Sequence, residues 1–143
     1  MLQIKELDYE KIISYAKEHL PEEACGLVAG CMDGGVKKIK KIYFLTNTDK
    51  SSTHYFMDIN EQLAAIRDMR KHGLALLGSW HSHPDSPAGF SEEDMRLAYD
   101  SSISYLVLSL MHRDEPQFKS YTISREKEVT EEPVILEKCE TNS

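Results

Sequence analysis

The chain has 143 residues, of which 41% are hydrophobic and 29% charged, a composition typical of one globular domain. Its net charge of −7 argues against a protein that binds nucleic acid or an anionic membrane surface through basic side chains. No stretch approaches the roughly 18 consecutive apolar residues that a membrane-spanning helix needs, and the first residues lack the apolar core of a signal peptide.

The first part of the chain carries one helix signal followed by two strand signals. Residues 8–20 have apolar side chains at helical spacing, and Asp8 is the expected N-cap. A short apolar run over 24–29 predicts a buried strand. The sequence Asp33-Gly34-Gly35 is typical of a hairpin turn, and residues 36–46 predict the strand that follows it.

The middle of the chain contains the clearest helix. A short strand is expected over 55–57, before the helix begins. The helix is predicted over 59–72, with Asp58 as its N-cap and Gly73 as its C-terminal stop. Its apolar stripe consists of Ile59, Leu63, Ile66 and Met69.

The rest of the chain alternates between strand and helix signals. A continuous apolar run over 74–80 predicts a central strand. A helix is predicted over 92–100, then a strand over 103–111 that pairs with a strand over 117–123. Helices interleaved with strands indicate an α/β or mixed α+β domain.

We expect the domain to cover residues 1–124 and residues 125–143 to form an acidic C-terminal tail or an edge element of the sheet. The cysteines are Cys25, Cys31 and Cys139, and none belongs to a C-x-x-C pair. An odd number of unpaired cysteines favours a reducing compartment, so we expect a cytoplasmic protein.

The strand over 74–80 leads into a group of metal-binding residue types. His81 and His83 are two residues apart, so in a strand they share one face. Asp94 lies in the first turn of the next predicted helix, and a loop with two prolines can return it to the strand end. Two histidines and one aspartate suit zinc and leave a fourth position for water, as in catalytic sites. Ser91 and Asp94 also match a helix capping box, which competes with metal binding for the aspartate.

This spacing resembles a known motif. His81-x-His83, seven intervening residues and Ser91-x-x-Asp94 resemble the JAMM (MPN+) motif of zinc metalloproteases. The resemblance covers about residues 8–123 and is to the short prokaryotic type of the family. It implies a single MPN/JAB-like domain with a curved mixed β-sheet flanked by helices.

The JAMM motif also includes an upstream glutamate, three residues before a glycine at the start of a strand. Glu23 occupies this position relative to Gly26, whereas Glu22 is one residue out of register. The resemblance implies that the two histidines and Asp94 hold Zn²⁺, and that Glu23 is the general base for a zinc-bound water. It implies that Ser91 donates a hydrogen bond to the oxyanion of the intermediate.

The resemblance also implies a substrate. Short prokaryotic members are associated with ubiquitin-like sulfur-carrier proteins and cleave the amide bond after the carrier's C-terminal Gly-Gly. The substrate is then a carrier precursor or a carrier–cysteine adduct, and the sequence does not choose between them. We expect the extended tail to pair with a sheet edge beside the zinc.

Two other classes of protein are a non-catalytic MPN scaffold and a different metal hydrolase, either of the metallo-β-lactamase or of the nucleoside deaminase type. A non-catalytic MPN scaffold usually lacks the ligands, whereas all five candidate positions are filled in this chain. A metallo-β-lactamase-type site needs H-x-H-x-D-H, and Ser86 stands where its last histidine belongs. A nucleoside deaminase needs P-C-x-x-C, which this sequence does not contain.

Overall fold

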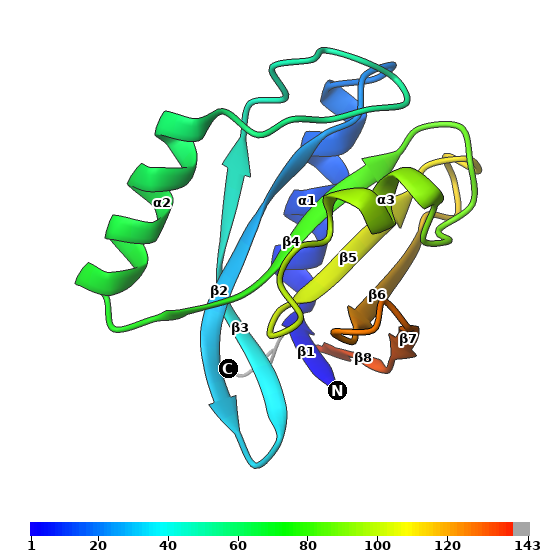
Figure 1. Ribbon diagram of the computed structural model, residues 1–143. Coiled ribbons are helices and arrows are strands. Elements are labelled where there is room, and N and C mark those ends of the chain that lie inside the picture. Colours follow the sequence, from blue (N-terminus) through cyan, green and yellow to red (C-terminus); the bar gives the residue numbers. More distant parts are fainter. Residues whose placement is uncertain (139–143) are drawn as a thin grey trace, which may run out of the picture.

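An eight-stranded mixed β-sheet organises the computed structural model, which describes residues 1–138 (Figure 1). The helices are α1 (Glu6–Glu18), α2 (Ile59–Lys71) and α3 (Glu92–Leu97). The strands are β1 (Leu2–Lys5), β2 (Cys25–Asp33), β3 (Val36–Leu45), β4 (Ala75–His83), β5 (Ser104–Ser109), β6 (Gln117–Ile123), β7 (Val129–Glu132) and β8 (Val134–Glu137). The predicted mixed α/β fold class is therefore confirmed.

The sheet is strongly curved. Its strands lie in the order β7-β6-β5-β4-β2-β3-β1-β8, so β7 and β8 are at opposite ends. Only Pro133 separates these two strands in the chain. The backbone N–H of Leu2, in β1, donates to the carbonyl of Pro133 at 2.9 Å. Two strands at opposite ends of the order can adjoin in the chain only if the sheet curls back on itself.

Helices cover both faces of this sheet. On one face, Ile12 and Ala16 of α1 belong to the main buried cluster, together with Trp80 of β4. On the other face, Ala65 and Met69 of α2 pack with residues of β2 and β3. Figure 1 shows α1 behind the sheet and α2 at its left. Trp80 is fully buried on the α1 side, as expected for the strand neighbour of His81, whose side chain points to the other face.

The first helix starts earlier than predicted. It begins at Glu6, and its N-cap is Lys5, which makes no side-chain cap bond. The predicted cap at Asp8 is wrong, because β1 runs directly into α1 and Asp8 falls in the first turn. The short strand β1 was not predicted; its neighbours β3 and β8 are distant in the chain.

The ends of α2 agree with the prediction, but its buried face differs. Asp58 accepts a hydrogen bond from the Glu61 N–H at 2.9 Å, and Gly73 has a φ of +66°. However, the side chains of Ile59 and Leu63 are 60% and 50% exposed. The helix packs through Met69, as predicted, and through Ala65, which was not predicted, so the apolar stripe is only partly correct.

Strands β3, β4 and β6 confirm the predicted strands, and β4 is central, between β2 and β5. The predicted strand over 55–57 is wrong; that segment makes a single bridge, between Asn47 and Met57. Helix α3 is shorter than predicted. Strand β8 lies at the sheet edge, while the domain boundary after residue 124 stays a prediction. Cys139 lies outside the described residues.

Within residues 1–138, no helix is both long enough and apolar enough to cross a membrane.

Candidate active site

Two histidines and an aspartate converge at the end of β4. The Nε2 atoms of His81 and His83 are 3.1 Å apart. Asp94, in the first turn of α3, places Oδ1 at 2.9 Å from Nε2 of His81 and Oδ2 at 3.2 Å from Nε2 of His83. All three residues are buried, and one ligand atom from each lies within 4.8 Å of the others. The structure thus brings together the three residues predicted as metal ligands.

The chemistry of these donors fits a divalent cation. Nδ1 of His83 lies 2.8 Å from the carbonyl of Pro87, and a proton on Nδ1 donated to that carbonyl leaves the Nε2 lone pair free for a ligand. Burial lowers the pKa of His81 and so favours its neutral form. Burial opposes ionisation of Asp94, but hydrogen bonds from His81 and His83 outweigh it and hold the carboxyl pKa well below its ordinary value. Burial opposes protonation of His83, but hydrogen bonds to Asp94 and Pro87 outweigh it and raise the pKa of His83, and a bound cation would take the place of the Nε2 protons that face Asp94. Two imidazoles and one carboxylate then form a donor set that suits zinc.

The capping and ligand interpretations of Asp94 are compatible. The hydroxyl of Ser91 accepts from the Asp94 N–H at 3.0 Å, and the Ser91 N–H donates to Oδ2 of Asp94 at 2.9 Å. The same carboxylate therefore closes the capping box and faces both histidines. In this box the Ser91 hydroxyl is only an acceptor, so its proton is free to donate to a ligand.

Glu23 lies two residues before β2, close enough to His83 and Asp94 for their charges to affect its pKa. It is 5% exposed, and burial, with a smaller contribution from the charge of Asp94, raises the pKa of its carboxyl to about 8. Its backbone is fixed from both sides: its N–H donates to the Ser51 carbonyl at 2.7 Å, and its carbonyl accepts from the Asn47 amide at 3.0 Å. A buried carboxyl with such a pKa can both accept and release a proton.

The glycine that follows Glu23 by three positions has a steric role. A Cβ on Gly26 would lie 1.9 Å from the Tyr43 carbonyl oxygen and 2.3 Å from Nε1 of Trp80. The indole N–H of Trp80 donates to that same carbonyl at 3.2 Å. Only glycine lets β2 pass between these groups and bring Glu23 level with the end of β4.

Two residues near the site were not singled out by the sequence. The ring of Tyr55 stacks on His81, with centroids 4.7 Å apart and planes 20° from parallel. Asn47 bonds to Glu23 and also holds the loop, because its amide donates to the His54 carbonyl and its oxygen accepts from the Phe56 N–H. Neither residue belongs to a motif, and both reach the site through the path of the loop over 46–58.

Within the described part of the chain, Cys25 does not belong to the group of His81, His83 and Asp94 that could hold a metal ion. Its thiol is buried and points to the Leu45 carbonyl, 3.6 Å away. Burial raises the pKa of this thiol to about 12, so it stays protonated at neutral pH.

The expected sheet edge beside the metal ligands is absent from the described part of the chain. Strand β4 pairs with β2 on one side and with β5 on the other, and the sheet ends in β7 and β8. The prediction that a substrate tail pairs with an edge beside the zinc is therefore wrong.

Fold and site together define a domain of the JAB/MPN class. The family model described as "Prokaryotic homologs of the JAB domain" matches residues 7–124. The chain belongs to this family, which confirms the resemblance seen in its motif.

Individual relatives agree with this assignment. The chain is 32% identical to the CysO-cysteine peptidase of Mycobacterium tuberculosis over 86% of its length and 82% of the relative's. It is 25% identical to a desampylase of Pyrococcus furiosus, covering 77% of this chain and 76% of the relative. A solution structure of a Desulfitobacterium hafniense protein superposes with a TM-score of 0.88 at 43% identity, over 96% of this chain and 94% of that one.

Proposed function

We propose that this chain is a zinc metallopeptidase that hydrolyses the amide bond after the C-terminal Gly-Gly of a ubiquitin-like sulfur-carrier protein. The observation that carries the proposal is the buried cluster of His81, His83 and Asp94, with the buried carboxyl of Glu23 near enough to interact with the charges of His83 and Asp94. The names of two relatives, CysO-cysteine peptidase and desampylase, support a hydrolase of this substrate class.

Each of the five site residues has a defined task. His81, His83 and Asp94 would hold the zinc ion, which when bound polarises a carbonyl and lowers the pKa of water to about 7. Glu23 accepts a proton from the attacking water and passes it to the leaving nitrogen, as its near-neutral pKa suits. Ser91 donates its hydroxyl proton to the carbonyl oxygen as negative charge develops there.

The first test is metal content. The wild-type protein should bind about one zinc ion per chain, because its three donors form one open tetrahedral site. The double variant His81→Ala/His83→Ala should lose the metal, since only one of the three donors remains. Stoichiometric zinc in this variant would refute the metal site.

The second test is cleavage of a purified bacterial sulfur carrier whose Gly-Gly terminus is extended by one cysteine. Release of the free carrier by the zinc-loaded protein is expected. A peptide that copies only the last residues of the carrier should react more slowly, because it lacks the folded surface. A zinc-loaded protein that leaves every such carrier intact would instead favour the non-catalytic MPN scaffold.

A further inference from the structure

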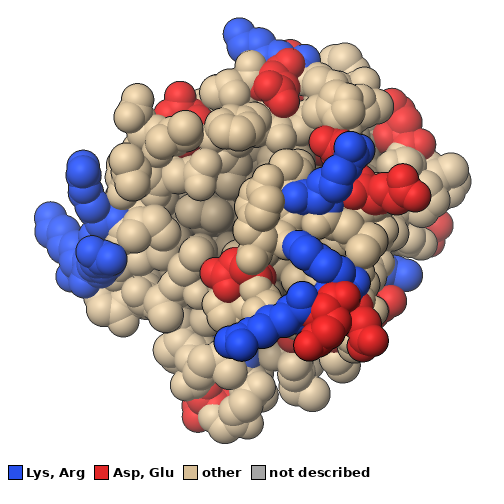
Figure 2. Space-filling model, in the orientation of Figure 1, with Lys and Arg blue, Asp and Glu red and all other residues tan. Residues whose placement is uncertain are grey.

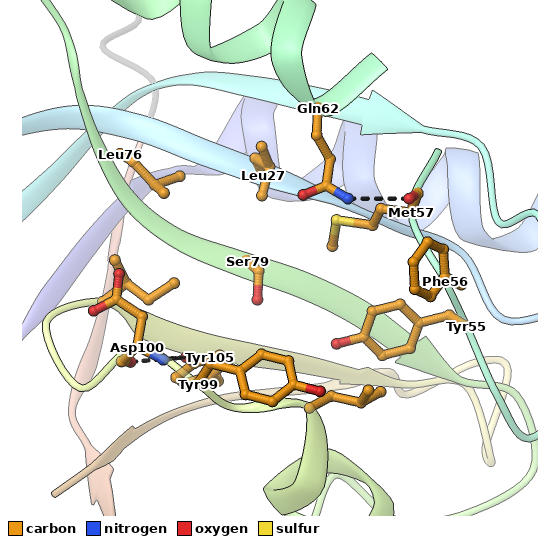
Figure 3. A pocket seen from close by; sticks show the side chains of 12 residues that line it. Leu27, Tyr55, Phe56, Met57, Gln62, Leu76, Ser79, Tyr99, Asp100 and Tyr105 are labelled. Atoms are coloured by element: carbon orange, nitrogen blue, oxygen red, sulfur yellow. Dashed lines mark hydrogen bonds between the residues drawn. The ribbon is translucent and has the colours of Figure 1, made fainter. Parts of the chain in front are cut away.

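A cavity of about 250 Å³ lies beside the metal ligands (Figure 3). It is enclosed by the segment around Tyr55, by α2, by β4 and by the chain that follows α3. Figure 3 shows apolar side chains such as Leu27, Leu76 and Phe56 around it. In the described part of the chain, neither lysine nor arginine contributes to its lining. The space-filling view likewise shows a hollow of uncharged surface between α2 and α3 (Figure 2).

This cavity shares a wall with the metal site. Tyr55 stacks on His81 with one face of its ring, while its hydroxyl points into the cavity toward Ser79 (Figure 3). Ser79 precedes His81 by two residues in β4, so both side chains are on the same face of the sheet. A chain bound over the metal ligands along β4 would therefore pass directly across the cavity mouth.

The position of Glu23 decides which part of the substrate reaches the cavity. In the pairing of β2 with β4, Cys25 lies opposite His81 and Leu27 lies opposite Ser79. Glu23, two residues before Cys25, is consequently at the His83 end, whereas the cavity is at the Ser79 end. Since Glu23 delivers its proton to the leaving nitrogen, the leaving group lies toward His83. The acyl side of the bond, which is the carrier's tail, extends toward the cavity.

The size of the cavity excludes the two glycines as its occupants. Glycine has no side chain, so Gly-Gly leaves a space of about 250 Å³ empty. At the rim, Phe56 and Tyr99 are 49% and 83% exposed, so two large aromatic side chains beside the cavity are open to a ligand. The carboxylate of Asp100 is already engaged by the N–H and hydroxyl of Ser102. The cavity is thus suited to an uncharged, apolar group.

We propose that this cavity binds one large apolar side chain of the carrier's tail, at a position that precedes Gly-Gly. The proposal rests on the proposed function and adds a specificity-determining pocket to it. Phe56 and Tyr99 form its rim, and Tyr55 separates it from the metal ligands. Recognition of the tail then depends on a side chain that the scissile bond itself does not contain.

The experiment uses the same cysteine-extended sulfur carrier as the cleavage test. Each of the four residues before Gly-Gly is replaced in turn by alanine, and kcat and KM are measured with the zinc-loaded protein. Loss of one apolar side chain should lower kcat/KM by about 10–100-fold, mainly through KM, because its burial is lost. The other replacements should change kcat/KM much less.

The enzyme variant is Phe56→Ala/Tyr99→Ala, and the matched control is Leu63→Ala. Leu63 is exposed to the same degree as Phe56, at 50% against 49%, but does not line the cavity. The tail replacement that lowers kcat/KM for the wild-type enzyme should have little further effect on kcat/KM for the double variant, because the pocket has already lost its rim. The Leu63→Ala control should retain the wild-type preference.

Binding without turnover provides a second readout. In a Glu23→Gln background, the affinity for the unaltered carrier should fall by a similar factor when Phe56 and Tyr99 are truncated. In one outcome, the wild type cleaves the carrier while every tail replacement changes kcat/KM equally for the wild type and for the double variant. That result would overturn the pocket and leave the proposed function intact. Failure of the zinc-loaded wild type to cleave any carrier would overturn both.

Discussion

Replacement of Glu23 by glutamine separates proton transfer from metal binding. The carboxamide keeps the shape of the side chain and one hydrogen-bond acceptor, but it cannot take up a proton. Glu23 is not among the three residues whose ligand atoms cluster. The loop is held through the backbone of Glu23, by Ser51 and Asn47, so Glu23→Gln leaves these bonds in place. Metal content and folding should both stay near the wild-type values.

The rate should fall by roughly 10²–10⁴-fold, the range for loss of a placed general base, which corresponds to about 3–5 kcal/mol of activation free energy. The stability should not decrease, because the variant removes a carboxyl whose ionisation burial already disfavours. Glu22→Gln is the matched control. Glu22 is only half-buried, and it lies one residue before the position that the JAMM motif assigns to its glutamate.

The assay is single-turnover cleavage of the carrier substrate, with metal analysis and thermal denaturation of the same preparations. A metal-loaded Glu23→Gln protein with a near wild-type rate would refute the role of Glu23 as the base. Loss of activity in Glu22→Gln with Glu23→Gln unaffected would show that the register of the strand entrance is misassigned.

Three further changes have distinct expected results. Asp94→Ala should lose both metal and activity in metal analysis and rate assays, because its carboxylate faces both histidines; retained zinc would contradict the site. Ser91→Ala should keep its zinc and lose roughly 10²–10³-fold in rate, since one oxyanion donor is removed; an unchanged rate would exclude that role. Glu132 is 9% exposed, and although burial opposes its ionisation, hydrogen bonds from the hydroxyls of Ser104 and Ser120 outweigh it and lower the carboxyl pKa. The stabilisation of the folded state by ionised Glu132 is fully present above the ordinary carboxyl pKa and is lost as the pH falls through the lowered value. Glu132→Gln should therefore reduce the free energy of unfolding in urea by about 1–3 kcal/mol at pH 7, and by less at low pH. A difference that does not change with pH would contradict this.

The sequence was sufficient for features that depend on neighbouring residues. The ends of α2 follow from Asp58 and Gly73, whose capping and left-handed conformations are local. The shared face of His81 and His83 follows from the alternation of a strand. The JAMM resemblance then identified Glu23, which no local rule would have separated from Glu22.

Features that depend on residues distant in the chain were decided only by the tertiary structure. Periodicity placed Ile59, Leu63 and Met69 in the core, but packing buries Met69 together with Ala65 and leaves Ile59 and Leu63 exposed, since the sheet selects which side of the helix it covers. The strand β1 was missed because its stability comes from its partners β3 and β8.

The site shows the same division. Three candidate ligands could be named from spacing, yet only the folded chain shows one carboxylate serving both the helix cap and the histidines. Tyr55 stacks on His81 and walls the cavity because a loop without any motif returns over the sheet. The spacing of residues along the chain determines which side chains share a face over a few residues. Which distant segments meet depends instead on the packing of the whole sheet. That packing decides what a substrate can touch.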